Sequence, residues 1–130
     1  MTLALGRDRG VEMKDSSILT TIKKLLGMTE NYTDYDDQII VYINSVFPTL
    51  NQLGIGTKEC FNITSADETW SSFLSDDNML ENVKTYIYMK VKIMFDPPQQ
   101  TNVMDALNRI IAENEWRLSV YKEHKEVTNA

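Results

Sequence analysis

With 130 residues, 42% hydrophobic and 25% charged, the chain has the size and balance of one globular domain rather than of a disordered segment. Its one cysteine and one histidine are too few for a Cys/His zinc site, a disulfide framework or a c-type haem attachment. The 13 basic and 19 acidic residues give a net charge of -6, which argues against a protein that wraps nucleic acid by neutralising phosphates.

The N-terminal residues 1–14 precede the first patterned segment, and a second methionine, Met13, stands just before that segment. We interpret residues 1–14 as a flexible arm or a leader; for residues 1–12 an added leader, an upstream start and a native arm all stay open. The apolar start is followed by Arg7 and Arg9, which reverses the order of a signal peptide. No run of about 20 apolar residues predicts a membrane span, so we expect a protein made in a reducing cytoplasm.

The first predicted helix covers residues 17–26, where apolar side chains recur with the spacing of one helical face. Asp15 or Ser16 is expected to cap its start. Gly27 is expected to end it in a left-handed conformation, since glycine adopts that conformation without steric cost.

The second predicted helix covers residues 34–53, with one apolar stripe along its length. Pro48 lies inside this stretch and lacks the N–H that a helical hydrogen bond needs. We therefore expect a kink between residues 44 and 48. The stripe consists of Ile39, Ile40, Ile43, Val46, Phe47, Leu50 and Leu53.

The middle of the chain is the least helical part. Residues 59–64 alternate in a way that predicts a short extended segment, and a short helix is predicted at residues 68–74. The fourth predicted helix starts near residues 75–76 and is apolar on more than half of its circumference. Such a helix is either the central helix of the domain or faces a second chain on one side. Because residues 86–95 also have strand-like composition, a strand there is the structural alternative.

A proline pair separates the fourth helix from the last one. Asp96, Pro97 and Pro98 end the fourth helix, because proline pushes the residue before it out of the helical region. The last predicted helix covers residues 101–122, and the tail at residues 123–130 is expected to be flexible because it lacks an apolar repeat. The predicted core stripe of the last helix is Val103, Met104, Leu107, Ile110, Ile111, Leu118 and Tyr121.

These elements together predict a mainly α fold. We expect a small bundle of about four to five helices, with a kinked second helix and a short extended segment near residues 59–64. Residues 15–122 are expected to form a single domain, because no second apolar pattern and no internal repeat is present.

No catalytic, metal-binding or cofactor-binding residue is predicted, and we expect the protein not to be an enzyme. His124 lies in a charged terminal segment, and Cys60 has the surroundings of an ordinary small thiol. Asp34, Asp36 and Asp37 lack the glycine and the glutamate that a calcium loop needs. Capping of a helix start explains these aspartates without an ion.

Two pairs of apolar side chains are not used by a monomeric core. Trp116 and Val120 lie four residues apart on the last helix, away from its core stripe, and tryptophan is enriched where interfaces carry their binding energy. Tyr88 and Met89 lie on a second face of the fourth helix. We predict these four residues as subunit-interface candidates, with partial burial under a loop or the tail as the alternative.

The order of parts over residues 16–122 resembles the head–tail connector (adaptor) proteins of tailed bacteriophages, formerly described as phage DNA-packaging proteins. The most specific element of the resemblance is Phe95-Asp96-Pro97-Pro98 between the two long helices. The other matching residues are the early helix at residues 18–27, Tyr35-Asp36-Asp37 before Gln38-Ile39-Ile40, Trp70 and Phe73, Leu107 and Ile111, and Glu115-Trp116-Arg117-Leu118.

The resemblance implies a structural protein at the head–tail interface of a virion, made in the cytoplasm of a bacterial host. It implies a closed ring of about a dozen identical subunits. Its expected partners are the portal protein and a tail-side stopper or tail-completion protein, with genomic DNA passing through the ring without sequence-specific binding. Neither a cofactor nor a membrane is expected.

Two alternatives belong to other classes. A small phage nucleic-acid-binding packaging or regulatory protein would need clustered arginines and lysines, whereas the basic residues here are dispersed among acidic ones. An enzyme acting through carboxylates would hold a divalent metal ion.

Overall fold

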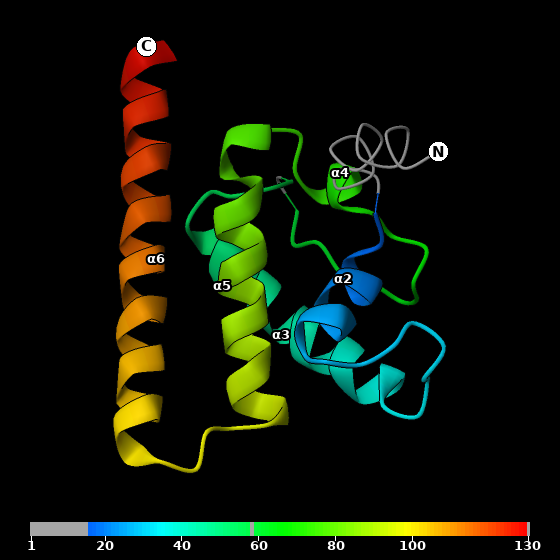
Figure 1. Ribbon diagram of the computed structural model, residues 1–130. Coiled ribbons are helices and arrows are strands. Elements are labelled where there is room, and N and C mark those ends of the chain that lie inside the picture. The colour runs from blue at the N-terminus through cyan, green and yellow to red at the C-terminus, as the bar shows by residue number, and fades with distance from the viewer. Residues whose placement is uncertain (1–15, 58, 130) are drawn as a thin grey trace, which may run out of the picture.

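The protein is described by a computed structural model that covers residues 16–57 and 59–129, with side chains as far as residue 123 (Figure 1). Within these residues the chain forms a small all-α bundle without a strand, which confirms the predicted fold class. The N-terminal arm predicted at residues 1–14 lies outside the described residues. The helices are α2 (Ile18–Leu25), α3 (Asp36–Gln52), α4 (Trp70–Phe73), α5 (Asp77–Phe95) and α6 (Thr101–Asn129).

Helix α5 is the central helix of the bundle, and α6, α3 and α2 all pack against it (Figure 1). Its apolar residues spread around the helix, so its buried side chains face three neighbours. The prediction that the fourth helix is the central helix of the domain is therefore confirmed. No strand forms at residues 86–95. The side-chain carboxylate of Asp76 caps its start, accepting a hydrogen bond from the Asn78 N–H at 2.9 Å.

Helix α2 begins one residue later than predicted. Its cap is Ser17, whose Oγ accepts a hydrogen bond from the Thr20 N–H at 3.1 Å. The expected cap Ser16 is therefore wrong, and Asp15 lies outside the described residues. Gly27 follows the helix with φ of 91°, which confirms the left-handed stop.

Helix α3 lies close to its predicted range, with Pro48 inside it; the kink at Pro48 stays a prediction. Its start is tied to α2 by a buried lysine. The Nζ of Lys23 lies 2.8 Å from a carboxylate oxygen of Asp36 and donates to the Glu30 carbonyl at 3.1 Å. Since the Lys23 side chain is only 3% exposed, both contacts are needed to offset the cost of burying its charge.

Residues 59–69 run along the bundle without regular secondary structure. The Asn44 side chain holds this segment, accepting from the Ile63 N–H at 2.8 Å and donating to the Ile63 carbonyl at 2.9 Å. Helix α4 follows and is shorter than the predicted 68–74. Its Trp70 is fully buried and donates from Nε1 to Thr21 Oγ1 at 3.0 Å, which fixes α4 against α2.

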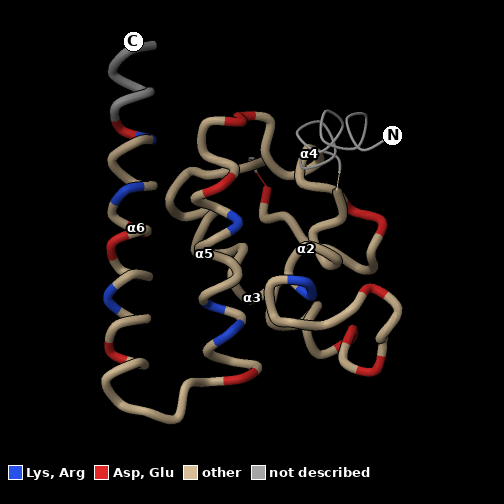
Figure 2. Tube along the Cα trace, viewed as in Figure 1, with Lys and Arg blue, Asp and Glu red and all other residues tan. Residues whose placement is uncertain are grey.

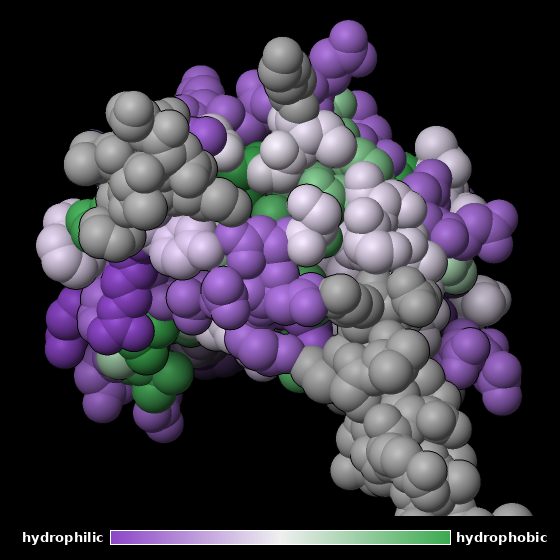
Figure 3. All heavy atoms as spheres, turned by 90° about the horizontal axis from the view of Figure 1, so that it is seen from above, coloured by the Kyte–Doolittle hydropathy of each residue, from purple (hydrophilic) through white to green (hydrophobic). Residues whose placement is uncertain are grey.

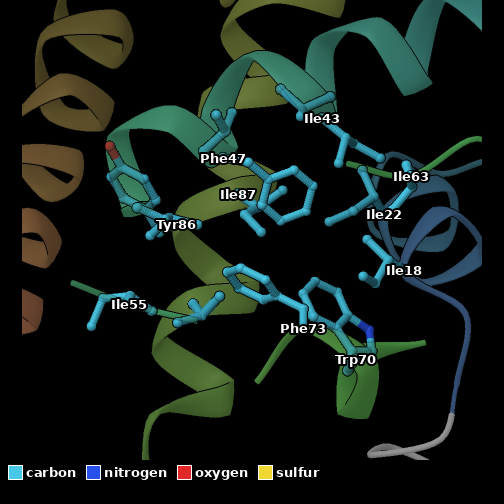
Figure 4. Packing of buried hydrophobic residues seen from close by; sticks show 14 of the residues in the cluster. Ile18, Ile22, Ile43, Phe47, Ile55, Ile63, Trp70, Phe73, Tyr86 and Ile87 are labelled. Carbon is cyan, nitrogen blue, oxygen red and sulfur yellow. The ribbon is translucent and has the colours of Figure 1, made fainter. Parts of the chain in front are cut away.

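The centre of the core holds three phenylalanine rings in mutual contact. The ring of Phe47 lies 5.3 Å from that of Phe61 and 4.9 Å from that of Phe73, measured between centroids. Figure 4 shows Phe47, Phe73 and Trp70 converging in the space between the helices. The backbone of Gly56 passes so close to Phe73 that a Cβ there would stand 2.3 Å from the ring. The turn therefore needs glycine both for space and for its φ of 93°.

Candidate assembly surface

Helix α6 forms one side of the bundle and packs mainly against α5 (Figure 1). It continues to Asn129, beyond the end predicted near residue 122. Covered residues recur along it at alternating steps of four and three. This spacing gives a narrow buried stripe, which we call the seam, and is typical of a helix that packs on one other helix. Val103 and Ile110 were predicted as core residues, but both are exposed. Val103 lies before the first residue of this seam, and Ile110 lies beside it. The seam consists of Leu107, Ile111, Asn114, Leu118 and Tyr121.

Two tyrosine hydroxyl groups fasten α6 to the rest of the bundle. Tyr86 of α5 donates to a carboxylate oxygen of Glu115 at 2.7 Å, and Tyr121 of α6 donates to a carboxylate oxygen of Asp76 at 2.7 Å. Burial, and secondly the Glu115 carboxylate, raise the pKa of Tyr86 well above its usual value. The phenol therefore stays protonated and acts as the donor.

Replacing Tyr86 by phenylalanine removes this bond while keeping the ring. We expect a loss of about 1.5 kcal/mol in the free energy of unfolding, the usual value for a hydrogen bond to a charged group, measured by urea denaturation. Tyr88→Phe is the matched control, because the described residues offer its half-buried hydroxyl no hydrogen-bond partner. Equal losses in the two variants would contradict the role of the Tyr86 bond.

The face of α6 opposite the seam carries an exposed tryptophan. Trp116 is 64% exposed and Val120 39% exposed. At 100° per residue Arg109 lies on the same side as Trp116, and Glu113 pairs with Arg117 beside it. We call Arg109, Glu113, Trp116 and Val120 the α6 outer face. The tyrosine hydrogen bonds that attach α6 to the bundle fix the position of this face relative to the rest of the subunit.

The other two interface candidates are covered by their own chain, Met89 almost fully and Tyr88 in part. Met89 is 4% exposed and belongs to the core, where α5 is covered by its neighbours. Tyr88 is half-buried and packs against the same core. Burial within their own chain leaves these residues little surface to offer, so we do not carry them into the interface proposed below.

The segment Phe95-Asp96-Pro97-Pro98 ends α5 and leads to α6. Asp96 stands just past the last helical residue and accepts from Lys92 Nζ at 2.7 Å. The ring of Phe95 packs edge-on against Tyr35, with 5.3 Å between centroids. The segment therefore fixes the turn between the two long helices and ties the end of α5 to the start of α3.

A second group of exposed apolar side chains was not predicted. Tyr32 lies in the loop before α3, and Tyr35 is the residue directly before the helix. Both side chains are exposed, with 5.8 Å between their ring centroids. Val41 is 64% exposed on α3, and Met94 is exposed near the end of α5, within 3.6 Å of Ser45 Oγ. We call Tyr32, Tyr35, Val41 and Met94 the aromatic surface. Its one signal in the sequence is that Val41 lies off the apolar stripe of its helix.

The described residues offer no constellation for acid–base, nucleophilic or metal chemistry. They contain no group of three or more His, Cys, Asp or Glu side chains that could hold a metal ion. A pocket open to solvent is lined by Gly56, Thr57 and residues 71–75, none of which is ionisable at neutral pH. Cys60 is exposed and has no disulfide partner, and the side chain of His124 lies outside the described part.

Comparison with known families decides the class. The sequence model of one protein family, described as 'Phage connector protein', matches residues 18–125, which is most of the chain. The chain belongs to the phage connector protein family. As a phage connector it has a structural role, in a family whose members assemble with phage head–tail proteins.

Comparisons of this phage connector with curated proteins and with solved structures gave no match. In the part of the connector that the structure describes, every helix is too short or too polar to cross a membrane. The family match thus rests on the same span of helices that forms the bundle, α2 to most of α6.

Proposed function

We propose that this phage connector forms a closed ring beneath the portal and joins the phage head to the tail, so that the genome passes through the ring. The observation that carries the proposal is the exposed Trp116 on a helix that the hydroxyl groups of Tyr86 and Tyr121 fasten to the bundle. Trp116 and Val120 expose apolar surface one helical turn apart on the same face of α6, and tryptophan is enriched among the residues that carry the binding energy of protein interfaces.

The charge of the chain supports passage of DNA rather than its retention. The net charge is -6, and Figure 2 shows basic residues dispersed among acidic ones along α5 and α6. A protein that grips DNA neutralises several phosphates at once with clustered lysines and arginines. A ring poor in such clusters lets the duplex slide.

The role of joining head and tail also determines the proposed partners, domain boundaries and location of the protein. The portal protein is the head-side partner, and a tail-side stopper or tail-completion protein is the other. Residues 15–122 form the connector domain, and the segments at residues 1–14 and 123–130 take part in docking, the second of them as the end of α6, which is helical to Asn129 rather than flexible as expected. The protein is made in the bacterial host cytoplasm, resides in the virion and has no enzymatic activity.

The ring is tested by light scattering on a size-exclusion column over a concentration series, followed by negative-stain imaging. We expect a particle of about a dozen times the subunit mass with an annular outline. A monomer at every concentration would contradict self-assembly. Retardation of DNA in a low-salt gel shift would favour the nucleic-acid-binding alternative instead.

A further inference from the structure

A ring of identical subunits needs two different contact surfaces on each subunit, one for each neighbour. For about a dozen subunits the rotation from one to the next is about 30°. The two surfaces must therefore lie on nearly opposite sides of the subunit. If the α6 outer face is one of them, the complementary surface belongs on the far side of the bundle.

The aromatic surface fulfils this condition for its two tyrosines. Figure 1 shows α6 on the left of the bundle and the loop between α2 and α3 on the right, with α5 between them. Tyr32 and Tyr35 belong to this loop and to its junction with α3. Most of the large apolar side chains exposed in the described residues lie either on α6 or on the aromatic surface, with Leu25 at the end of α2 outside both groups.

The aromatic surface is surrounded by carboxylates. Glu30, Asp34 and Asp37 are exposed beside it, and Figure 2 shows acidic residues gathered in this part of the molecule. Asp37 lies one helical turn before Val41 and on the same side of α3. Two copies of such a surface would place like charges against each other, which disfavours a symmetric contact.

The α6 outer face can accept these carboxylates. Arg109 lies two turns before Trp116 on the same side of the helix, and the described residues give it no ion-pair partner. The face is mixed in charge, since Asp105 and Glu113 also lie near Arg109. A guanidinium group there can pair with a carboxylate and stack on a tyrosine ring.

We propose that the α6 outer face of one subunit docks on the aromatic surface of the next copy. Trp116 and Val120 pack against Tyr35 and Val41 of the neighbour, and Arg109 lies among the neighbour's carboxylates. The proposal rests on the ring proposed above and specifies which two surfaces meet. Exposed apolar area is then covered on both sides of every subunit.

The pairing is tested by cross-linking in a Cys60→Ser background, which removes the exposed native thiol. Val41→Cys and Val120→Cys are combined in one chain and treated with a flexible bis-maleimide, which joins two nearby thiols. Because the proposed contact brings Val120 of one subunit beside Val41 of the next, we expect links between subunits and a ladder of multimers on a denaturing gel. The matched control combines Val120→Cys with Thr85→Cys, an exposed position on α5 outside both surfaces.

Light scattering on the same variants before cross-linking separates the two proposals. A ladder from the Val41/Val120 variant, with at most dimers from the control, supports the pairing. Large particles without a ladder, or with equal ladders in both variants, overturn the pairing and leave the ring in place. Monomers without a ladder overturn the ring and the pairing together.

Discussion

Replacing Trp116 by alanine is expected to weaken subunit association while leaving the bundle folded. Truncation of a central aromatic anchor costs about 2 kcal/mol or more per interface, which is about a 30-fold weaker association. Because Trp116 makes little contact with its own chain at 64% exposure, far-UV circular dichroism and the thermal midpoint should stay close to those of the parent. Light scattering over a concentration series measures the shift from large particles to monomers.

Ile110→Ala is the control for this experiment, since Ile110 is also exposed on α6 but lies beside the seam rather than on the α6 outer face. The control should assemble as the parent does. A normal ring from the Trp116 variant would remove Trp116 from the interface. Loss of helicity in that variant would mean that Trp116 stabilises the subunit itself.

Gly56→Ala is expected to give the largest loss of stability among the glycine substitutions. A left-handed backbone costs a residue with a Cβ about 1–2 kcal/mol, and Gly56 has φ of 93°. In addition, the new Cβ would stand 2.3 Å from the buried Phe73 ring, and overpacking of this kind costs about 1–3 kcal/mol. We expect a total loss of about 2–5 kcal/mol, measured by urea denaturation.

Gly27→Ala separates these two costs. Gly27 has nearly the same φ, 91°, but nothing lies within 4 Å of the position that its Cβ would take. It should lose only the backbone contribution of about 1–2 kcal/mol. Equal losses at both positions would show that the Phe73 ring moves aside freely, and the tight packing of this turn would then have no energetic weight.

The helices that the sequence predicted well are those with strong local signals. Gly27 and the proline pair after Asp96 mark helix ends through backbone geometry alone, and the structure ends α2 and α5 there. The wide apolar circumference of α5 correctly indicated burial on several sides, since a central helix needs apolar residues in every direction.

The features that the sequence did not predict depend on tertiary contacts. Ile110 fits a helical apolar stripe, and its exposure follows from the fact that a single helix covers α6. The bond between Tyr86 and Glu115 joins two helices and has no fixed spacing in the sequence. The sequence placed Trp116 outside the core, because this residue departs from the apolar stripe of its helix. The exposure of Tyr32 and Tyr35 was not predicted, because both lie at a loop, where periodicity carries no information.

The buried contacts of Lys23 have a consequence for the kinetics of the proposed assembly. By binding the Glu30 carbonyl and Asp36 together, Lys23 restrains the backbone that carries Tyr32 and Tyr35 before any neighbour arrives. Ordering a side chain during association costs about 0.5–1.5 kcal/mol of conformational entropy, and a loop that is already restrained avoids part of this cost. Subunits would then join as nearly rigid bodies, at a rate set by their encounter rather than by rearrangement of the loop.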